Sequence, residues 1–376
     1  MPKKTINILG VTGSIGESTA KVILSNPDAF DVNVISGHSN RAALADLKDK
    51  LGAKYAICTQ DEDVANYLDE AVDLTVSAIT GFAGLRPLLK AIEVSKAVGI
   101  ANKEPLVAAG PLVMQACKKY HTQILPIDSE HNAIFQVFDE SNRDGIERII
   151  LTASGGPFRT WDKVAIENAT PEQAIAHPNW TMGKKISVDS ASMMNKALEV
   201  IEAHILFDMT PGAIDVLVHP QSVVHSMVEY SDGSILSQMG ASDMCTPIAY
   251  ALSWPQRMKT PGQRLDLARM GQLEFEALDD NKFPAILYAK QAIESGLGAC
   301  VALNAANEVA VHAFLEGNMH FGGIMDCVSF ALEDFKQCGK SIANDAFLED
   351  IEELDLQIRS NVNAYIDNEI KRVKAG

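Results

Sequence analysis

The chain has 376 residues, of which 47% are hydrophobic, and a formal net charge of −17. This length exceeds one ordinary hydrophobic core, so two or three domains are expected, and the negative field disfavours nucleic acid and anionic membranes as partners. The six cysteines lack paired spacing, no export signal precedes the first predicted strand, and no apolar run approaches the roughly 18 residues of a membrane span, which predicts a reduced, cytoplasmic protein.

Residues 5–126 alternate short β-rich runs with helical stretches, which is the pattern of βαβ units and a parallel sheet. The β-rich runs are INILGV, DVNVISG, DLTVSAI, AVGIAN and QILPI. We therefore predict an α/β, Rossmann-like, nucleotide-binding domain over residues 1–127.

The first of these runs leads into three glycines, Gly10, Gly13 and Gly16, and then into a helical stretch. Glycines here let the backbone approach a pyrophosphate, and the N-terminus of the helix offers it unpaired N–H groups. The GxxGxxG spacing is less specific than GxGxxG, so a tight turn without a ligand is the alternative.

The second run, residues 31–37, ends without the acidic residue that usually binds the ribose of NAD. The polar and basic segment Gly37–Arg41 follows instead. Such a segment can hydrogen-bond a 2′-phosphate and favours NADP, with an ordinary polar turn as the alternative.

Two polar triplets, residues 102–104 and 128–130, follow predicted strands, where open α/β sheets place their ligand crevice. If the second triplet is extended, Asp128 and Glu130 direct both carboxylates to one point, because residues two apart share a face. Two oxygen ligands of this kind suit Mg²⁺ or Mn²⁺. The alternative is a helix N-cap with favourably placed negative charges.

Residues 128–257 are predicted to form an α+β domain with an antiparallel or mixed sheet. Its strands would lie in RIILTAS and in VLVHPQSVVHSMVEY-SDGS-ILSQM, with a turn at Asp232-Gly233. Ser154 follows the first of them and precedes two glycines, so it can offer O–H and N–H donors to an anion, or simply form a turn.

Residues 190–201 have the spacing of one amphipathic helix. Ser192, Asn195, Lys196 and Glu199 would form a polar stripe, whose mixture of groups suits a phosphate and a metal ion. An ordinary solvent-facing stripe is the alternative. Residues 177–185 have no periodicity and combine a histidine, a tryptophan and two lysines; they predict a lid over a ligand, or else packed surface. His219 and His225 are expected to be structural.

Residues 258–283 begin with a Pro/Gly/basic stretch and are predicted to be a linker. Residues 284–376 are expected to form an α-helical bundle of about four helices, near 284–295, 299–316, 323–337 and 345–372, separated by glycines.

Seven stretches together resemble the 1-deoxy-D-xylulose 5-phosphate reductoisomerase family along the whole chain. They are GVTGSIG, ANKE, LPIDSEHNAIFQ, ASGGPF, HPNWTMGKKISVDSASMMNKALEVIEA, HPQSVVHSMV and ALNAANE. The resemblance implies a homodimer that rearranges 1-deoxy-D-xylulose 5-phosphate and reduces the product with NADPH to 2-C-methyl-D-erythritol 4-phosphate, in non-mevalonate isoprenoid biosynthesis.

The resemblance also implies the roles of individual residues. The ion, Mg²⁺, Mn²⁺ or alternatively Co²⁺, would be bound by Asp128, Glu130 and Glu199. Lys103 and Ser129 would hold the substrate backbone together with these ligands, and Trp180 and Met182 would cover the substrate. The substrate phosphate would bind Ser154, His177, Ser190, Asn195 and Lys196. NADPH would bind Thr12, Gly13, Ser14, Ile15, Gly37, Asn40, Asn102, Glu104 and Gly183.

One departure concerns residues 38–39, His-Ser, which lack a lysine that some family members carry near the 2′-phosphate. Two other functions remain open from the residues alone. One is an NADP-linked dehydrogenase without metal or rearrangement, and the other is a nucleotide-sensing regulator whose acidic triplets are only helix caps.

Overall fold

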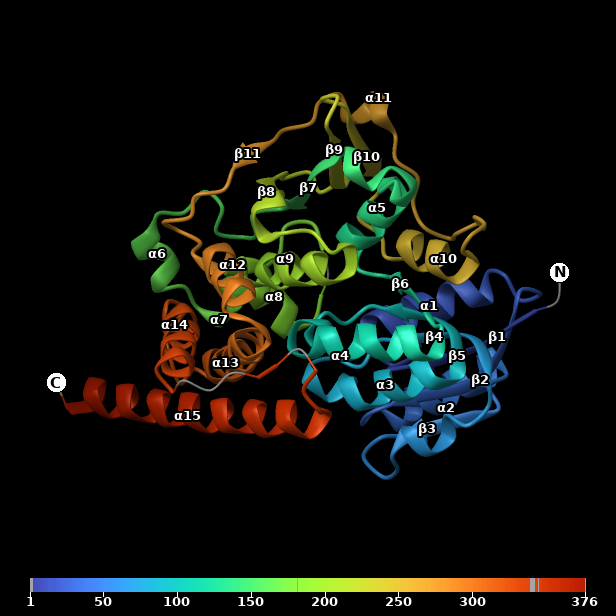
Figure 1. Ribbon diagram of the computed structural model, residues 1–376, viewed down its shortest axis with the longest axis horizontal. Helices are drawn as coiled ribbons and strands as arrows, with labels where there is room; N and C mark the ends of the chain where they lie inside the picture. The colour runs from blue at the N-terminus through green and yellow to red at the C-terminus, as the bar shows by residue number, and fades with distance from the viewer. Residues whose placement is uncertain (1–2, 181, 339–341, 344, 376) are drawn as a thin grey trace. The chain divides into compact units, whose positions relative to one another are not determined.

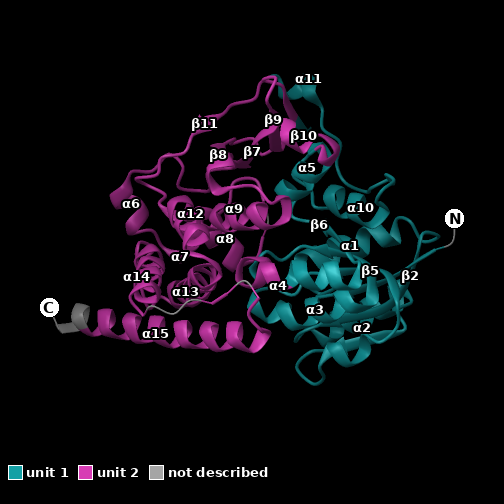
Figure 2. Ribbon diagram, in the orientation of Figure 1, with its two compact units in different colours: residues 1–105, 113–138, 237–271 teal, residues 106–112, 139–236, 272–376 magenta. Residues whose placement is uncertain are grey.

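The computed structural model describes residues 3–180, 182–338, 342–343 and 345–375 (Figure 1). The chain forms two compact units, each assembled from three stretches of sequence (Figure 2). Unit 1 contains Met1–Pro105, Val113–Phe138 and Ser237–Gly271, and unit 2 contains Leu106–Leu112, Asp139–Leu236 and Gln272–Gly376.

Unit 1 is built on a six-stranded sheet of order β3-β2-β1-β4-β5-β6, with every neighbouring pair parallel. The predicted parallel sheet is therefore confirmed. The strand that the sequence did not reveal is β3, because it has only four residues and only the last two of them are buried. The strands are β1 (Lys4–Leu9), β2 (Phe30–Gly37), β3 (Tyr55–Cys58), β4 (Val72–Ser77), β5 (Ser95–Ile100) and β6 (Gln123–Pro126).

The central strands of unit 1 are apolar along nearly their whole length because helices cover the sheet. Ile6 and Ile8 of β1 are fully buried, and α2 and α3 pack on β2–β5. The helices of this unit are α1 (Ser14–Leu24), α2 (Arg41–Leu51), α3 (Leu85–Val94), α4 (Glu104–Tyr120, of which residues 106–112 are assigned to unit 2), α5 (Ser129–Val137), α10 (Cys245–Ser253) and α11 (Leu267–Met270), with the short 3₁₀ helices η1 (Val64–Tyr67) and η2 (Phe82–Gly84).

The helix α10 joins this core although it lies more than a hundred residues after β6. Ile248 and Leu252 share one hydrophobic cluster with Ile6 and Ile8. Lys4 Nζ donates hydrogen bonds of 3.0 Å to the carbonyl oxygens of Leu252 and Trp254. The helix α10 thus covers part of the six-stranded sheet of unit 1.

Unit 2 contains a five-stranded sheet of order β10-β9-β7-β8-β11. Strand β7 pairs parallel with β8 and antiparallel with β9, and β11 pairs antiparallel with β8, so the predicted mixed sheet is confirmed. The predicted turn is present, because Gly233 has φ +84° and the N–H of Tyr230 donates to the carbonyl oxygen of Ser234 at 2.9 Å. The strands are β7 (Ile146–Ala153), β8 (Ile214–Val218), β9 (Val224–Tyr230), β10 (Ile235–Met239, where the unit boundary falls) and β11 (Glu276–Ala277).

The remaining helices of unit 2 confirm the predicted C-terminal helical region. In Figure 1 the long α15 runs beside α13 and α14. The helices are α6 (Lys163–Glu167), α7 (Pro171–Ile175), α8 (Lys184–Ala191), α9 (Met194–Phe207), α12 (Ala285–Ser295), α13 (Leu297–Leu315), α14 (Gly323–Gln337) and α15 (Leu348–Ala375), with η3 (Glu140–Gly145) and η4 (Pro211–Ala213).

The helix α13 differs from expectation in one respect. Among the described residues it alone is long and apolar enough, by length and composition, to cross a membrane, although the sequence was read as having no such run. Inside the structure 78% of this stretch is buried, as expected of the central helix of a bundle.

Candidate active site

A cavity of about 710 Å³ opens in unit 1 at the carboxyl ends of its strands. Its wall includes Gly10 and Gly13, which follow β1, and Gly37, which ends β2. A Cβ on Gly10, which has φ +86°, would lie 2.5 Å from the carbonyl oxygen of Ala78, and one on Gly16 would lie 2.3 Å from that of Gly10. The glycines therefore permit a turn too tight for side chains, and Gly13, the N-cap of α1, lies in the wall of this cavity.

The other predicted cofactor residues have individual local roles. The side chain of Thr12 would lie 3.0 Å from a Cβ on Gly37, so this glycine leaves room for the loop after β1. Ser14 and Ile15 form the first turn of α1. The side chain of Asn102 donates to the carbonyl oxygen of Gly81 at 3.3 Å and so fixes the loop after β4.

Asn40, Glu104 and Gly183 complete the predicted cofactor set. Asn40 is the N-cap of α2 and accepts a hydrogen bond from the N–H of Ala43 at 3.1 Å. Glu104 is the buried first residue of α4. Gly183 belongs to unit 2, where it precedes α8 and has open space at its Cβ position.

The sequence analysis missed much of the cavity wall. Apart from Ser36, which lies in β2, the missed residues follow β3 and β4, and the rule that ligands bind at the carboxyl ends of parallel strands could have identified those after β4. Those after β3 could not be found, because β3 itself was not recognised. Gly10 and His38 were named in the sequence analysis but not assigned to the cofactor. The wall residues that it did not name at all are Ser36, Thr59, Gln60, Asp61, Glu62, Asp63, Val64, Ala78, Ile79, Thr80, Ala83 and Pro87.

The segment after β2, which favoured NADP in the sequence, is tied to the end of β3. Arg41 forms a two-pronged ion pair with Asp61, one arm of which measures 2.7 Å. His38 Nδ1 lies 3.0 Å from Thr59 Oγ1. The guanidinium of Arg41 is thus already paired with a carboxylate, and a 2′-phosphate would compete with Asp61 for it or use its remaining N–H groups.

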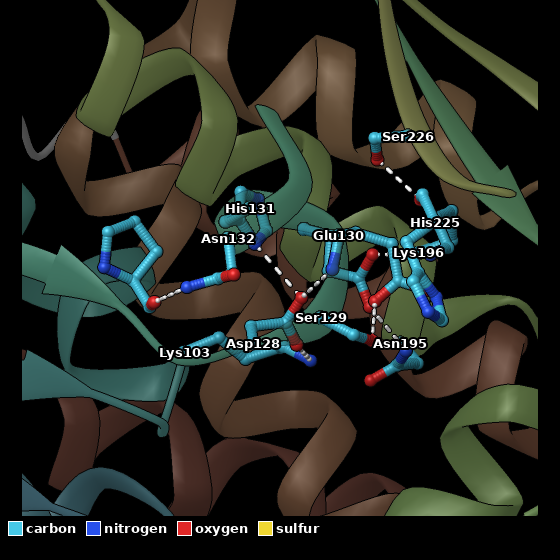
Figure 3. A network of polar contacts seen from close by, with 12 residues as sticks. Lys103, Asp128, Ser129, Glu130, His131, Asn132, Asn195, Lys196, His225 and Ser226 are labelled. Carbon is cyan, nitrogen blue, oxygen red and sulfur yellow. Dashed lines mark hydrogen bonds and ion pairs between the residues drawn. The ribbon is translucent and has the colours of Figure 1, made fainter. Parts of the chain in front are cut away.

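Asp128 is held by three groups of unit 1 (Figure 3). Its Oδ2 accepts a hydrogen bond of 2.8 Å from Lys103 Nζ, and its Oδ1 lies 3.1 Å from His131 Nδ1. Burial disfavours the charged form, but the Lys103 ammonium and the hydrogen bond from His131 outweigh it and hold the pKa of Asp128 well below its usual range. The carboxylate is therefore ionised and available as a hard oxygen ligand.

Residues 128–130 do not form an extended segment. Asp128 is the N-cap of α5 and accepts a hydrogen bond from the N–H of Glu130 at 3.2 Å, while Ser129 and Glu130 form the first helical turn. Ser129 Oγ donates to Glu130 Oε2 at 2.7 Å. The helix cap, considered as the alternative, is what the structure shows, because capping satisfies N–H groups that an isolated helix end leaves unpaired.

Glu199 is fully buried in α9 of unit 2. Its Oε1 accepts a 2.5 Å hydrogen bond from Asn195 Nδ2, and its Oε2 is paired with Lys196 Nζ. The side chain of Lys196 is only 5% exposed, so two opposite charges are buried together. Removing either partner of such a pair would leave an uncompensated charge in the protein interior and destabilise the fold.

The single helix predicted over residues 190–201 is also wrong. Met193 has φ +62°, which ends α8 before it and begins α9 after it. Ser192 consequently lies between the helices, where its Oγ accepts from the N–H of Met194 at 3.3 Å, and it does not extend the polar stripe. Asn195, Lys196 and Glu199 share α9 as expected.

Ser154 lies at the end of β7 in a turn that packs on α8. Gly155 and Gly156 have φ +82° and +64°, and a Cβ on Gly156 would lie 2.7 Å from the carbonyl oxygen of Ser190. The structure thereby brings Ser154 and Ser190 into one corner of unit 2. A side chain at residue 156 would push these two serines apart.

Hydrogen bonding around Ser154 leaves its hydroxyl proton available. His177 Nδ1 accepts from the N–H groups of Asn179 and Trp180 at 3.1 and 3.0 Å, so the proton of a neutral ring is on Nε2, which donates to Ser154 Oγ at 2.9 Å. Burial lowers the pKa of His177 and favours this neutral form. Ser154 Oγ also accepts from the N–H of Gly156 at 3.1 Å, so it can donate its own proton to an anion.

The predicted lid segment, residues 177–185, is anchored within unit 2. Asn179 Nδ2 donates to the carbonyl oxygen of Pro220 at 2.6 Å and to Ser222 Oγ at 3.1 Å, and the ring of Trp180 lies 6.5 Å from that of His225. Met182 is half-buried, and Thr181 lies outside the described residues.

His219, which was expected to be structural, is buried, and its Nδ1 lies 2.7 Å from the carbonyl oxygen of Glu274.

The family models that match the chain are all models of one enzyme family. That of 1-deoxy-D-xylulose 5-phosphate reductoisomerase matches residues 6–73 and 62–110, and that of its C-terminal domain matches residues 124–207. The model of the DXP reductoisomerase C-terminal domain matches residues 239–361.

Curated proteins and solved structures of the same family match almost the full chain. The reductoisomerase of Rhodospirillum centenum is 50% identical, over 85% of this chain and 84% of that protein, and the enzyme of Zymomonas mobilis is 46% identical, over 93% and 95%. The solved structure of the Zymomonas mobilis enzyme in complex with NADPH has a TM-score of 0.87 at 40% identity and covers 97% of this chain and 99% of that chain.

A crystal structure of DOX-P reductoisomerase in complex with NADPH, fosmidomycin and magnesium has a TM-score of 0.90 at 41% identity, over 99% of this chain and 100% of that one. The resemblance noted in the sequence is thus confirmed by sequence and by fold. The chain belongs to the 1-deoxy-D-xylulose 5-phosphate reductoisomerase family.

Proposed function

We propose that this protein is an NADP-dependent oxidoreductase that converts 1-deoxy-D-xylulose 5-phosphate to 2-C-methyl-D-erythritol 4-phosphate with NADPH and a divalent cation, in isoprenoid biosynthesis. The observation that carries this proposal is that a chain of this family combines a cavity at the glycine turn with carboxylates paired to lysines and with a serine whose hydroxyl can donate a hydrogen bond to an anion. The two relatives whose structures contain NADPH, one of them with magnesium, support the choice of cofactors.

We propose that Asp128, Glu130 and Glu199 bind the divalent cation, Mg²⁺, Mn²⁺ or alternatively Co²⁺. The set offers only carboxylate oxygens, which hard cations prefer, and two of its members already face positive charge from Lys103 and Lys196. When bound, the ion would supply Lewis acidity toward the substrate oxygens. Lys103, beside Asp128, is placed to relay a proton or to stabilise the developing negative charge.

The substrate phosphate is proposed to bind Ser154, His177, Ser190, Asn195 and Lys196. The hydrogen-bond pattern at Ser154 supports this assignment, because its proton points to no acceptor among the described residues. Phosphate binding supplies remote binding energy that orients the reacting carbons. Ser129 is proposed to hold the substrate backbone, and Trp180 and Met182 to cover the substrate and exclude water.

NADPH is proposed to occupy the cavity of unit 1, along Thr12, Gly13, Ser14 and Ile15. Gly37 and Asn40 would lie near the adenosine, and Asn102, Glu104 and Gly183 further along. The positive end of α1 and the glycine turn support the pyrophosphate position. The hydride then completes the reaction by reducing the aldehyde that the rearrangement forms.

A spectrophotometric assay tests cofactor, metal and substrate together. With 1-deoxy-D-xylulose 5-phosphate, Mg²⁺ and NADPH, the absorbance of the reduced nicotinamide should fall; a chelator should stop the reaction, and Mg²⁺ or Mn²⁺ should restore it. Full activity in chelator would instead favour a dehydrogenase without metal. No turnover in any combination would favour the nucleotide-sensing regulator.

We further propose a cytoplasmic homodimer, with the chain organised as a 1–127 NADPH domain, a 128–257 connective and catalytic domain, a 258–283 linker and a 284–376 helical bundle. The chain mass is 40.6 kDa, so light scattering should give about twice that value. A concentration-independent monomer would contradict the dimer.

A further inference from the structure

The most buried polar contact between the C-terminal helices and α8 joins Asn307 to Asp189. Asn307 Nδ2 of α13 donates to Asp189 Oδ1 of α8 at 2.9 Å. The second oxygen of the same carboxylate, Oδ2, is paired with Lys185 Nζ at 2.7 Å. Asn307 is 0% and Asp189 1% exposed, so a full negative charge is buried between two helices with one partner on each oxygen.

Local sequence gives α8 little stability of its own. It has eight residues, its N-cap Gly183 makes no side-chain cap, and Lys184 and Lys185 place positive charge at the positive end of the helix dipole. Contacts with the rest of unit 2 must therefore hold α8 in place. Asp189 supplies two of them, because it neutralises Lys185 and accepts the hydrogen bond from α13.

The position of α8 matters because its two ends carry proposed site residues. Ser190 directly follows Asp189, and its carbonyl oxygen contacts the turn of Gly156 that carries Ser154. Gly183 directly precedes α8 and follows the segment of Trp180. A shift of α8 would therefore move the proposed phosphate donors and the lid segment together.

Asn307 also carries a cost that a purely apolar contact would avoid. Its Oδ1 is buried and accepts no hydrogen bond from any residue the structure describes. An unpaired buried amide oxygen is unfavourable, and the hydrogen bond from Nδ2 to Asp189 is the favourable polar contact of this side chain that offsets it.

We infer that Asn307 is a positioning residue for the substrate phosphate: through Asp189 it fixes α8, and thereby Ser190 and Lys185. This inference rests on the proposed function. It assigns to the C-terminal helices a part in substrate binding, although Asn307 lies outside every proposed ligand set.

The test compares Asn307→Ala with Asn304→Ala. Asn304 lies one turn earlier on α13, is equally buried, and donates to Glu308 instead of Asp189, so the two truncations remove the same atoms from the same helix. For Asn307→Ala, KM for 1-deoxy-D-xylulose 5-phosphate and the inhibition constant of inorganic phosphate should each rise about tenfold, while kcat changes by less than about threefold. The dissociation constant of NADPH, measured by its fluorescence, should stay unchanged in both variants.

Asn304→Ala should lower the melting temperature to a similar extent and leave KM and the phosphate constant at wild-type values. Equal KM values in the two variants, or an unchanged phosphate constant in Asn307→Ala, would overturn the inference. If Asn307→Ala does not fold, Asn307→Leu replaces it, because leucine keeps most of the side-chain volume but cannot donate to Asp189; KM should again rise, and an unchanged KM again overturns the inference. Failure of the proposed function looks different, since the wild-type protein itself would then not oxidise NADPH.

Discussion

Replacing Glu199 by glutamine is expected to remove most turnover while NADPH binds as tightly as before. Glutamine keeps the size and the hydrogen-bonding oxygen of the side chain but loses its negative charge. If Glu199 is a ligand of the catalytic cation, the substrate loses a Lewis-acid contribution of several kcal/mol, and kcat should fall by about a hundredfold or more. NADPH should be unaffected, because Glu199 is not among the residues proposed to bind the dinucleotide, and the cavity wall proposed for it contains no residue of α9.

The measurements are kcat and KM with saturating Mg²⁺, the Mg²⁺ concentration at half-maximal rate, and the dissociation constant of NADPH. Glu229→Gln is a matched control, because Glu229 is also a carboxylate of unit 2 paired with a cation, Arg148, at 2.6 Å. It should leave the rate and the metal requirement unchanged. Near-wild-type turnover of Glu199→Gln, with the same need for Mg²⁺, would remove Glu199 from the metal site.

Replacing Lys196 by alanine should weaken substrate binding and also destabilise the fold. Loss of a charge-assisted contact to phosphate is worth about 2–3 kcal/mol, which corresponds to a rise in KM of roughly 30-fold or more. The structure adds a second effect, because Lys196 is the buried partner of Glu199. Leaving that carboxylate without its cation should lower the free energy of unfolding by about 3–5 kcal/mol.

The double variant Lys196→Ala/Glu199→Gln separates the two effects. Removing both charges should restore most of the lost stability, because no uncompensated charge stays buried, but it should not restore the rate. Lys163→Ala, at an exposed lysine of α6, is the control for a lysine-to-alanine change. An unchanged KM in Lys196→Ala would exclude Lys196 from phosphate binding, and unchanged stability would contradict the buried pair.

The predictions that the structure confirms come from residues, mainly glycines, that restrict or free the backbone at their own position. The glycines at 10, 13 and 16 predicted a close backbone turn between strand and helix; a Cβ at Gly16 would lie 2.3 Å from the carbonyl oxygen of Gly10, and one at Gly10 would lie 2.5 Å from that of Ala78. The four C-terminal helices were placed within a few residues of their observed bounds, because glycines separate long periodic segments.

The errors have a common physical cause. Residues 128–130 were left open between an extended segment and a helix cap, and residues 190–201 were read as one helix, but Asp128 caps α5 and Met193 breaks the helix at φ +62°. In both cases a single residue at an element boundary decides where the side chains point. The periodicity of apolar residues indicates which face of a segment is buried, but it does not locate the residue at which an element begins or ends.

Sequence by itself determined the family, the parallel nucleotide-type sheet and which residue types could bind a phosphate or a metal, because these depend on local pattern and on chemistry carried by each side chain. Only the tertiary structure decided which polar groups are paired: Lys103 with Asp128, Arg41 with Asp61, and Asn307 with Asp189, the last two of which are 118 residues apart. Pairing of this kind depends on burial and on distances of a few ångströms, and neither is written in the spacing of residues along the chain.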